Sequence, residues 1–158
     1  MPTETDSLDF SNLSLNQPIA AFAGLVMAVT QSWLVLSGNF SWLNLVTIVL
    51  TALLAVAFTY TSVIKLVGIP DMRASAEHLG FSYPTYRRIG ALETAAVIGL
   101  LVGLFIPAIG MAAAAGLVLL MTGAAVTHLR AGDGPVSGVP ATLGVLAVVY
   151  LVFRIASI

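Results

Sequence analysis

The chain has 158 residues, of which 59% are hydrophobic and only 8% are charged, with a formal net charge of −1 and no cysteine. A soluble domain carries about 25% charged residues, so lipid must be the main solvent of this chain and we expect an integral membrane protein. The near-zero net charge gives no reason to expect nucleic acid as a partner, and the absence of cysteine excludes disulfides, thiol catalysis and thiolate-bound iron–sulfur or haem groups.

The N-terminal part divides into a polar and an apolar segment. Residues 1–17 are acidic and polar, without the basic start and cleavage site of a secretory signal, and we interpret them as a disordered tail. Residues 19–37 carry no charge, and as a helix they are about 28 Å long, just enough to cross a bilayer. A polar triplet at 30–32 leaves a helix in the membrane interface as the alternative. We predict an extra N-terminal transmembrane helix over residues 18–38.

The next apolar run extends from Trp42 to Lys65, two residue types that are typical of the membrane interfaces, and it predicts a span. Residues 66–88 then carry most of the charges of the chain. Within them, Pro70 predicts the start of a short helix and Gly80 its end. Its apolar face toward the membrane surface is expected to contain Met72, Ala76 and Leu79.

A single carboxylate interrupts the apolar run from Ile89 to Ile106, which we predict to be the next span. If the helix begins near Tyr83, Glu93 lies about 8 Å deeper than the headgroup level. A carboxylate costs about 3 kcal/mol at mid-depth of a bilayer, so Glu93 needs a partner or a water-filled cavity. Gly99 and Gly103 form a GxxxG pair in the same helix, which permits close helix packing.

Two further spans are predicted over residues 111–129 and 141–155, joined by a loop that is rich in glycine and proline. Nearly all basic residues fall on one side of this topology, and the positive-inside rule assigns the loops 66–88 and 130–139 to the cytoplasm. The predicted fold class is therefore all-α: a multi-pass transmembrane helical bundle in the cell membrane. Residues 42–156 form a four-helix membrane domain, and the extra N-terminal helix precedes it.

The same topology places a candidate polar pocket at one depth, formed by Lys65, Glu93, His128 and Arg130. Lys65 would offset the desolvation of Glu93, and His128 could titrate near neutral pH, move a proton, or bind a quinone or an anionic headgroup. Tyr60 and Thr61, one turn below Lys65, are secondary candidates.

Structural readings of the same residues stay open. Lys65 can be a snorkelling anchor, Arg130 a positive-inside residue, and His128 a favourable charge at a helix end. A buried pair of Lys65 with Glu93 can simply hold two helices in register. His78 is expected to be solvated, and two histidines are too few for a histidine-rich metal site.

A series of short motifs resembles the DoxX-like family of small bacterial membrane proteins over about residues 44–155. The motifs are Lys65-Leu66 with Gly68, Leu79-Gly80, Ile89-Gly90, Leu92-Glu93, Ala125, His128-Leu129-Arg130, Gly132-Asp133 and Pro140-Ala141. The resemblance implies a four-helix membrane bundle and a link to quinone-dependent membrane redox complexes. It also implies that the four pocket residues are the family's polar positions. The N-terminal extension through Asn39 departs from the family pattern.

Three functions are compatible with these features. The first is an accessory subunit of a membrane redox system, with no covalent cofactor and a quinone bound at the cytoplasmic interface. The second is a structural or assembly subunit of a membrane complex, and the third is a small proton-coupled transporter. No motif for a nucleophile with its base, a phosphate-binding loop or a dinucleotide site appears, which favours an accessory subunit over a stand-alone enzyme. The expected partners are the lipid bilayer and a membrane protein or a second copy of the chain.

Overall fold

The computed structural model describes residues 24, 25, 28 and 41–157 of the chain. The elements in residues 41–157 are all helices: α2 (Trp42–Val67), α3 (Pro70–His78), α4 (Tyr83–Val102), α5 (Pro107–Arg130) and α6 (Gly138–Ala156). The expected tail of residues 1–17 lies outside the described residues. Of the expected helix 18–38, only residues 24, 25 and 28 are described, and all three are helical. The predicted all-α class is confirmed.

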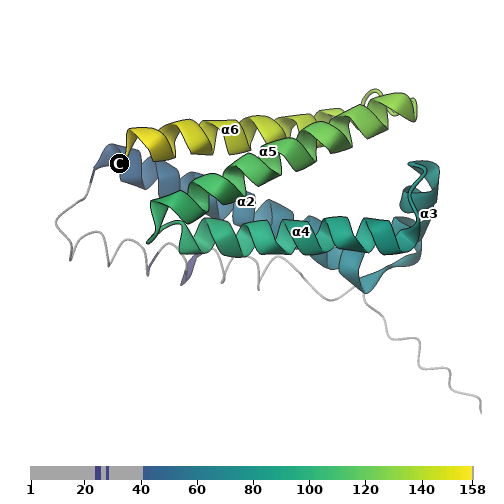
Figure 1. Ribbon diagram of the computed structural model, residues 1–158, viewed down its shortest axis with the longest axis horizontal. Helices are drawn as coiled ribbons and strands as arrows, with labels where there is room; N and C mark the ends of the chain where they lie inside the picture. The colour runs from purple at the N-terminus through teal and green to yellow at the C-terminus, as the bar shows by residue number, and fades with distance from the viewer. Residues whose placement is uncertain (1–23, 26–27, 29–40, 158) are drawn as a thin grey trace, which may run out of the picture.

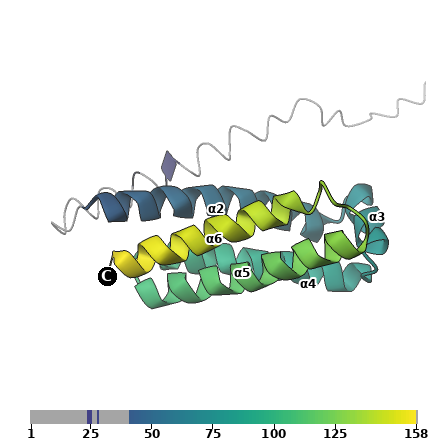
Figure 2. The ribbon, with the colours of Figure 1, turned by 90° about the horizontal axis from the view of Figure 1, so that it is seen from above.

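Helices α2, α4, α5 and α6 lie along one another, and α3 lies across one end of them (Figure 1). Helix α2 packs against α4 and α6, and α5 packs against the same two helices from the other side. Figure 2 shows the same arrangement from above. The apolar core between the four helices is formed by fully buried side chains from each of them: Leu54, Phe58, Leu100, Leu117, Ala147 and Tyr150.

Three of the described helices, α2, α5 and α6, are long and apolar enough to cross a membrane. Helix α4 differs because Arg87, Arg88 and Glu93 all lie in its first three turns. Its apolar part is also shorter than predicted, since the helix ends at Val102 and not at Ile106. The reason is Pro107, which begins α5 and holds Ile106 in an extended conformation, with φ −119° and ψ 92°.

The predicted GxxxG pair packs α4 against α5. A Cβ atom on Gly99 would lie 2.7 Å from the Cβ of Ala113, and one on Gly103 would collide with the backbone of Gly110. Only glycine at these positions allows the two backbones to come so close. From this contact the two helices diverge toward the end that carries α3 (Figure 1).

The short helix α3 begins at Pro70 as predicted, and the chain leaves it through Gly80, whose φ is 75°. The Phe81 backbone N–H donates to the Ala76 carbonyl at 2.8 Å, which closes the turn. Ala76 is buried, and α3 packs against α4. The apolar face of α3 therefore packs at least partly on the protein itself, where the sequence had suggested a membrane surface.

Candidate functional site

Glu93 forms a buried ion pair with Lys65. The Lys65 ammonium donates to Oε1 of Glu93 at 2.5 Å, and the Thr61 hydroxyl donates to Oε2 at 3.2 Å. Glu93 is only 1% exposed, while the side chain of Lys65 keeps 13% of its surface exposed. Both carboxylate oxygens are thus satisfied by groups of α2, and the positive charge offsets the desolvation of the negative one.

A glycine allows α4 to approach α2 at this pair. Gly90 lies about one turn before Glu93, and a Cβ atom there would lie 3.0 Å from the Cβ of Lys65 and 3.2 Å from the carbonyl oxygen of Ser62. The Tyr83 hydroxyl donates to the Lys65 carbonyl at 3.2 Å. This bond satisfies one of the carbonyls that a helix leaves free at its C-terminus, and it holds the last turn of α2 against the first turn of α4.

An aromatic wall covers the pair on one side. The Lys65 Nζ atom lies 5.7 Å from the centroid of the Tyr86 ring, within the range of a cation–π interaction. The Phe81 ring stacks on Tyr86 with centroids 6.5 Å apart. The ammonium group is therefore held between a carboxylate and an aromatic face.

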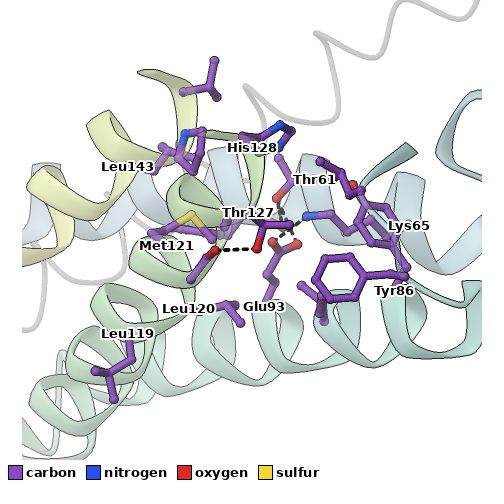
Figure 3. Close-up of a pocket in the computed structure, with 18 of the residues that line it drawn as sticks. Thr61, Lys65, Tyr86, Glu93, Leu119, Leu120, Met121, Thr127, His128 and Leu143 are labelled. Carbon is purple, nitrogen blue, oxygen red and sulfur yellow. Dashed lines mark hydrogen bonds and ion pairs between the residues drawn. The ribbon is translucent and has the colours of Figure 1, made fainter. Parts of the chain in front are cut away.

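The pair faces a cavity of about 600 Å³ in the part of the bundle where the helices diverge. Figure 3 shows Lys65, Glu93 and Thr61 at its polar end, with Thr127 and His128 of α5 also labelled on its lining. The remaining wall is mainly apolar and comes from all four long helices and the two connections near α3; among its residues are Phe58, Ile89, Leu120, Met121 and Leu143. A volume of this size is typical of sites for small molecules, which are likewise mostly apolar with a few polar groups.

A second polar cluster ties together the connections near the cavity. Asp133, between α5 and α6, accepts from the Nδ1–H of His128 at 3.0 Å and from the Nε2–H of His78 at 2.8 Å. The donor assignment follows because an ionised carboxylate only accepts hydrogen bonds. The bond from His78, and then the bond from His128, lowers the pKa of Asp133 below its ordinary value. The bridge joins α3 to the end of α5.

The structure thus divides the candidate pocket residues into three groups. Lys65, Glu93 and Thr61 are in direct contact. His128 lines the same cavity, but its hydrogen bond goes to Asp133 and not to Glu93. Arg130 and Tyr60 are exposed and lie outside the cavity lining.

The sequence reasoning missed three residues of this region. Asp133 was part of a recognised motif but had no assigned role, and the spacing of five residues from His128 was its only signal. His78 is exposed as expected, yet it is hydrogen-bonded. Tyr86 lies seven residues before Glu93, a spacing that places both on one face of α4. In residues 24, 25, 28 and 41–157 there is no group of three or more histidine, cysteine, aspartate or glutamate residues that could hold a metal ion.

Comparison with known proteins identifies one extended match. The family model described as the DoxX-like family matches residues 49–150, more than half of the chain and a range that contains the whole cavity lining. A model of the lipase maturation factor transmembrane domain matches residues 9–60, most of which lie outside the described part. No curated protein and no solved structure matches the chain.

Proposed function

The chain belongs to the DoxX-like family of membrane proteins, and on that premise we propose that it is a non-catalytic accessory subunit of a membrane redox system that holds a quinone. The observation that carries the proposal is the buried pair of Lys65 and Glu93 at the polar end of a largely apolar cavity of about 600 Å³. An apolar cavity with one polar end matches a molecule that has a polar head and an apolar body.

The charge of the site favours an uncharged head. Lys65 and Glu93 neutralise each other, so an anionic ligand would meet the carboxylate and a cationic ligand would meet the ammonium. A quinone avoids both conflicts because its carbonyls accept hydrogen bonds from Lys65, and the hydroxyls of its reduced form donate to Glu93 or His128. The Tyr86 and Phe81 rings supply a flat apolar wall for the ring of the ligand.

The positive-inside rule supports a cytoplasmic position for this end of the bundle, since Lys65, Arg73, Arg87, Arg88 and Arg130 lie in or beside its loops. Because the chain has no cysteine, single cysteines can test the topology directly. We expect a membrane-impermeant maleimide to label Ala156→Cys in intact cells and Glu77→Cys only after permeabilisation. The reverse pattern would place the cavity at the outer side.

The quinone proposal is tested by extracting the protein into mild detergent and analysing the bound lipids by chromatography. We expect wild-type protein to retain quinone and Glu93→Gln to lose it by tenfold or more, while Arg130→Gln, an exposed change outside the cavity, retains it. Thermal unfolding of each variant checks that the fold persists. A wild-type preparation that contains no quinone and binds none when ubiquinone is added back would refute the proposal.

The contacts of the pair favour a purely structural role as the second candidate. Thr61 and Lys65 already satisfy both oxygens of Glu93, so the pair could serve only to join α2 and α4 in a subunit that stabilises a larger membrane complex. On this alternative, the stability loss of Glu93→Gln would be accompanied by no change in quinone content.

A further inference from the structure

The cavity is open on one flank of α5. Gly116, Leu119 and Gly123 line it, although all three are exposed on the outer side of that helix, and Leu119 is 75% exposed. Their spacing of three and four residues places them on one face of α5. A Cβ atom on Gly116 or Gly123 would meet nothing within 4 Å. We call the opening bounded by these three residues the side window.

The side window lies where α4 and α5 separate. Before it, the two helices touch through Gly99 with Ala113 and through Gly103 with Gly110. Beyond it, they diverge toward α3 (Figure 1), and the α4 residues that line the cavity, Tyr86, Ile89 and Glu93, belong to this diverging half. The interior therefore communicates with the outer surface between these two helices.

The end of the cavity near α3 is covered differently. Leu79 and Phe81 of the α3–α4 connection line it, and Val136 of the α5–α6 connection lines it from the other side. His78, the last residue of α3, donates a hydrogen bond to Asp133 of the α5–α6 connection and so ties the two sides of this end to each other. This hydrogen bond holds the two sides of that end together, although Val136 itself is 52% exposed, whereas no such tie spans the side window in the part of the chain that the structure describes.

We infer that the ligand passes between the cavity and the bilayer through the side window, and that its apolar tail extends outward there. This inference rests on the proposed function, because it takes the cavity as a binding site. Helix α5 is one of the helices able to cross the membrane, so the medium outside the window is hydrocarbon. A charged, water-soluble molecule would be excluded from that route. The ligand is a lipid-dissolved molecule with an uncharged polar head and a long apolar tail.

The first test measures exchange of radiolabelled ubiquinone-10 between protein in nanodiscs and empty vesicles. We expect Gly116→Phe and Gly123→Phe to slow the exchange by tenfold or more, because a phenyl group fills the window. The matched control is Ala115→Phe, an exposed change in the same helix that lies outside the cavity lining, and its rate should stay within twofold of wild type. Equilibrium binding of the tail-less head, 2,3-dimethoxy-5-methyl-1,4-benzoquinone, should change little in all three variants.

The second test needs no quinone and so separates the two proposals. Leu120→Cys puts the chain's only thiol on the cavity wall. We expect the lipid-soluble N-pyrenylmaleimide to label it at least tenfold faster than a charged methanethiosulfonate from water. Adding Gly116→Phe should slow the lipid-soluble reagent, and adding Ala115→Phe should not.

The outcomes assign failure separately to each proposal. If N-pyrenylmaleimide labels Leu120→Cys as expected but neither quinone binds, the quinone proposal is refuted and the side window is retained. Quinone binding with exchange and labelling unaffected by both phenylalanine variants refutes the window. Labelling by the charged reagent as fast as by the pyrenyl reagent also refutes it, because the cavity would then open to water. Thermal unfolding of each variant is the control for folding, and leucine at the same position replaces any phenylalanine that prevents folding.

Discussion

Removing either charge of the buried pair should destabilise the protein, and removing both should cost much less than the sum of the two single losses. Lys65→Met leaves the carboxylate of Glu93, which is 1% exposed, with only the Thr61 hydroxyl as a partner. We expect a loss of about 3 kcal/mol in the free energy of unfolding, the lower end of the range for breaking a buried pair, because Thr61 still offers a hydrogen bond.

Glu93→Gln should be milder. The glutamine retains an acceptor for the Thr61 hydroxyl. The Lys65 ammonium loses its carboxylate partner, but its side chain is already 13% exposed and can extend toward water from the last turn of α2. We expect a loss of about 2 kcal/mol. The double variant places two uncharged side chains of similar length at the site, and its loss should also be about 2 kcal/mol, which makes the coupling energy about 3 kcal/mol.

The assay is equilibrium unfolding in mixed micelles with increasing mole fraction of sodium dodecyl sulfate, followed by circular dichroism. Arg130→Gln serves as the control partner: combined with Glu93→Gln, it should give strictly additive losses, because the exposed Arg130 lies outside the site. A double variant of Lys65 and Glu93 that loses the sum of the single losses, about 5 kcal/mol, would show that the two groups do not stabilise each other and would remove the energetic basis of the site.

Three further changes test other parts of the structure. Hydrogen bonds from the two histidines lower the pKa of Asp133 from its ordinary 3.8, so the stabilisation by these bonds is complete above that value and is lost as the pH falls below it. Between about pH 5 and pH 2, the thermal unfolding temperature should therefore fall less for Asp133→Asn than for wild type. An equal fall for both proteins would contradict the bridge. The methyl group of Gly103→Ala collides with the Gly110 backbone, so this change should lower the free energy of unfolding by about 2 kcal/mol. The control Gly138→Ala, whose methyl group meets nothing, should change the free energy of unfolding by less than about 0.5 kcal/mol. Equal losses would mean that α4 and α5 are not in contact at Gly103. Arg154 is buried and donates to the Gly103 carbonyl at 2.7 Å, so Arg154→Met should lower the free energy of unfolding by about 2 kcal/mol, and a fully stable variant would rule out this tie between α6 and the end of α4.

The described helices were largely predictable because residue types close to their ends determine where they begin and end. Apolar runs of sufficient length mark α2, α5 and α6, and Pro70 and Gly80 mark α3. The end of α4 was misplaced because hydropathy continues unchanged through the turn. Pro107 marks the break, but it begins α5, so the turn lies at residues 103–106 and not at residues 107–110, which the predicted spans had left between them.

The pairing of Lys65 with Glu93 could be anticipated for an energetic reason. A carboxylate within an apolar helix requires a partner, and few basic groups lie at its depth. The same reasoning grouped His128 with Glu93, and His128 does line the same cavity, but its hydrogen bond goes to Asp133, five residues further along the chain. The prediction from the sequence compared only the depths of these residues in the membrane, and it did not consider that Asp133 lies close to His128 along the chain.

The amino-acid sequence by itself determines the solvent of this protein, its helical class and the need of Glu93 for a positive partner, since each follows from transfer energies of individual side chains. Only the tertiary structure decided that α4 and α5 touch at their glycines and then separate. That divergence creates both the cavity and the side window. It depends on how closely α4 and α5 can approach at each point along their length. That distance is set by the side chains of both helices together and not by the sequence of either helix alone.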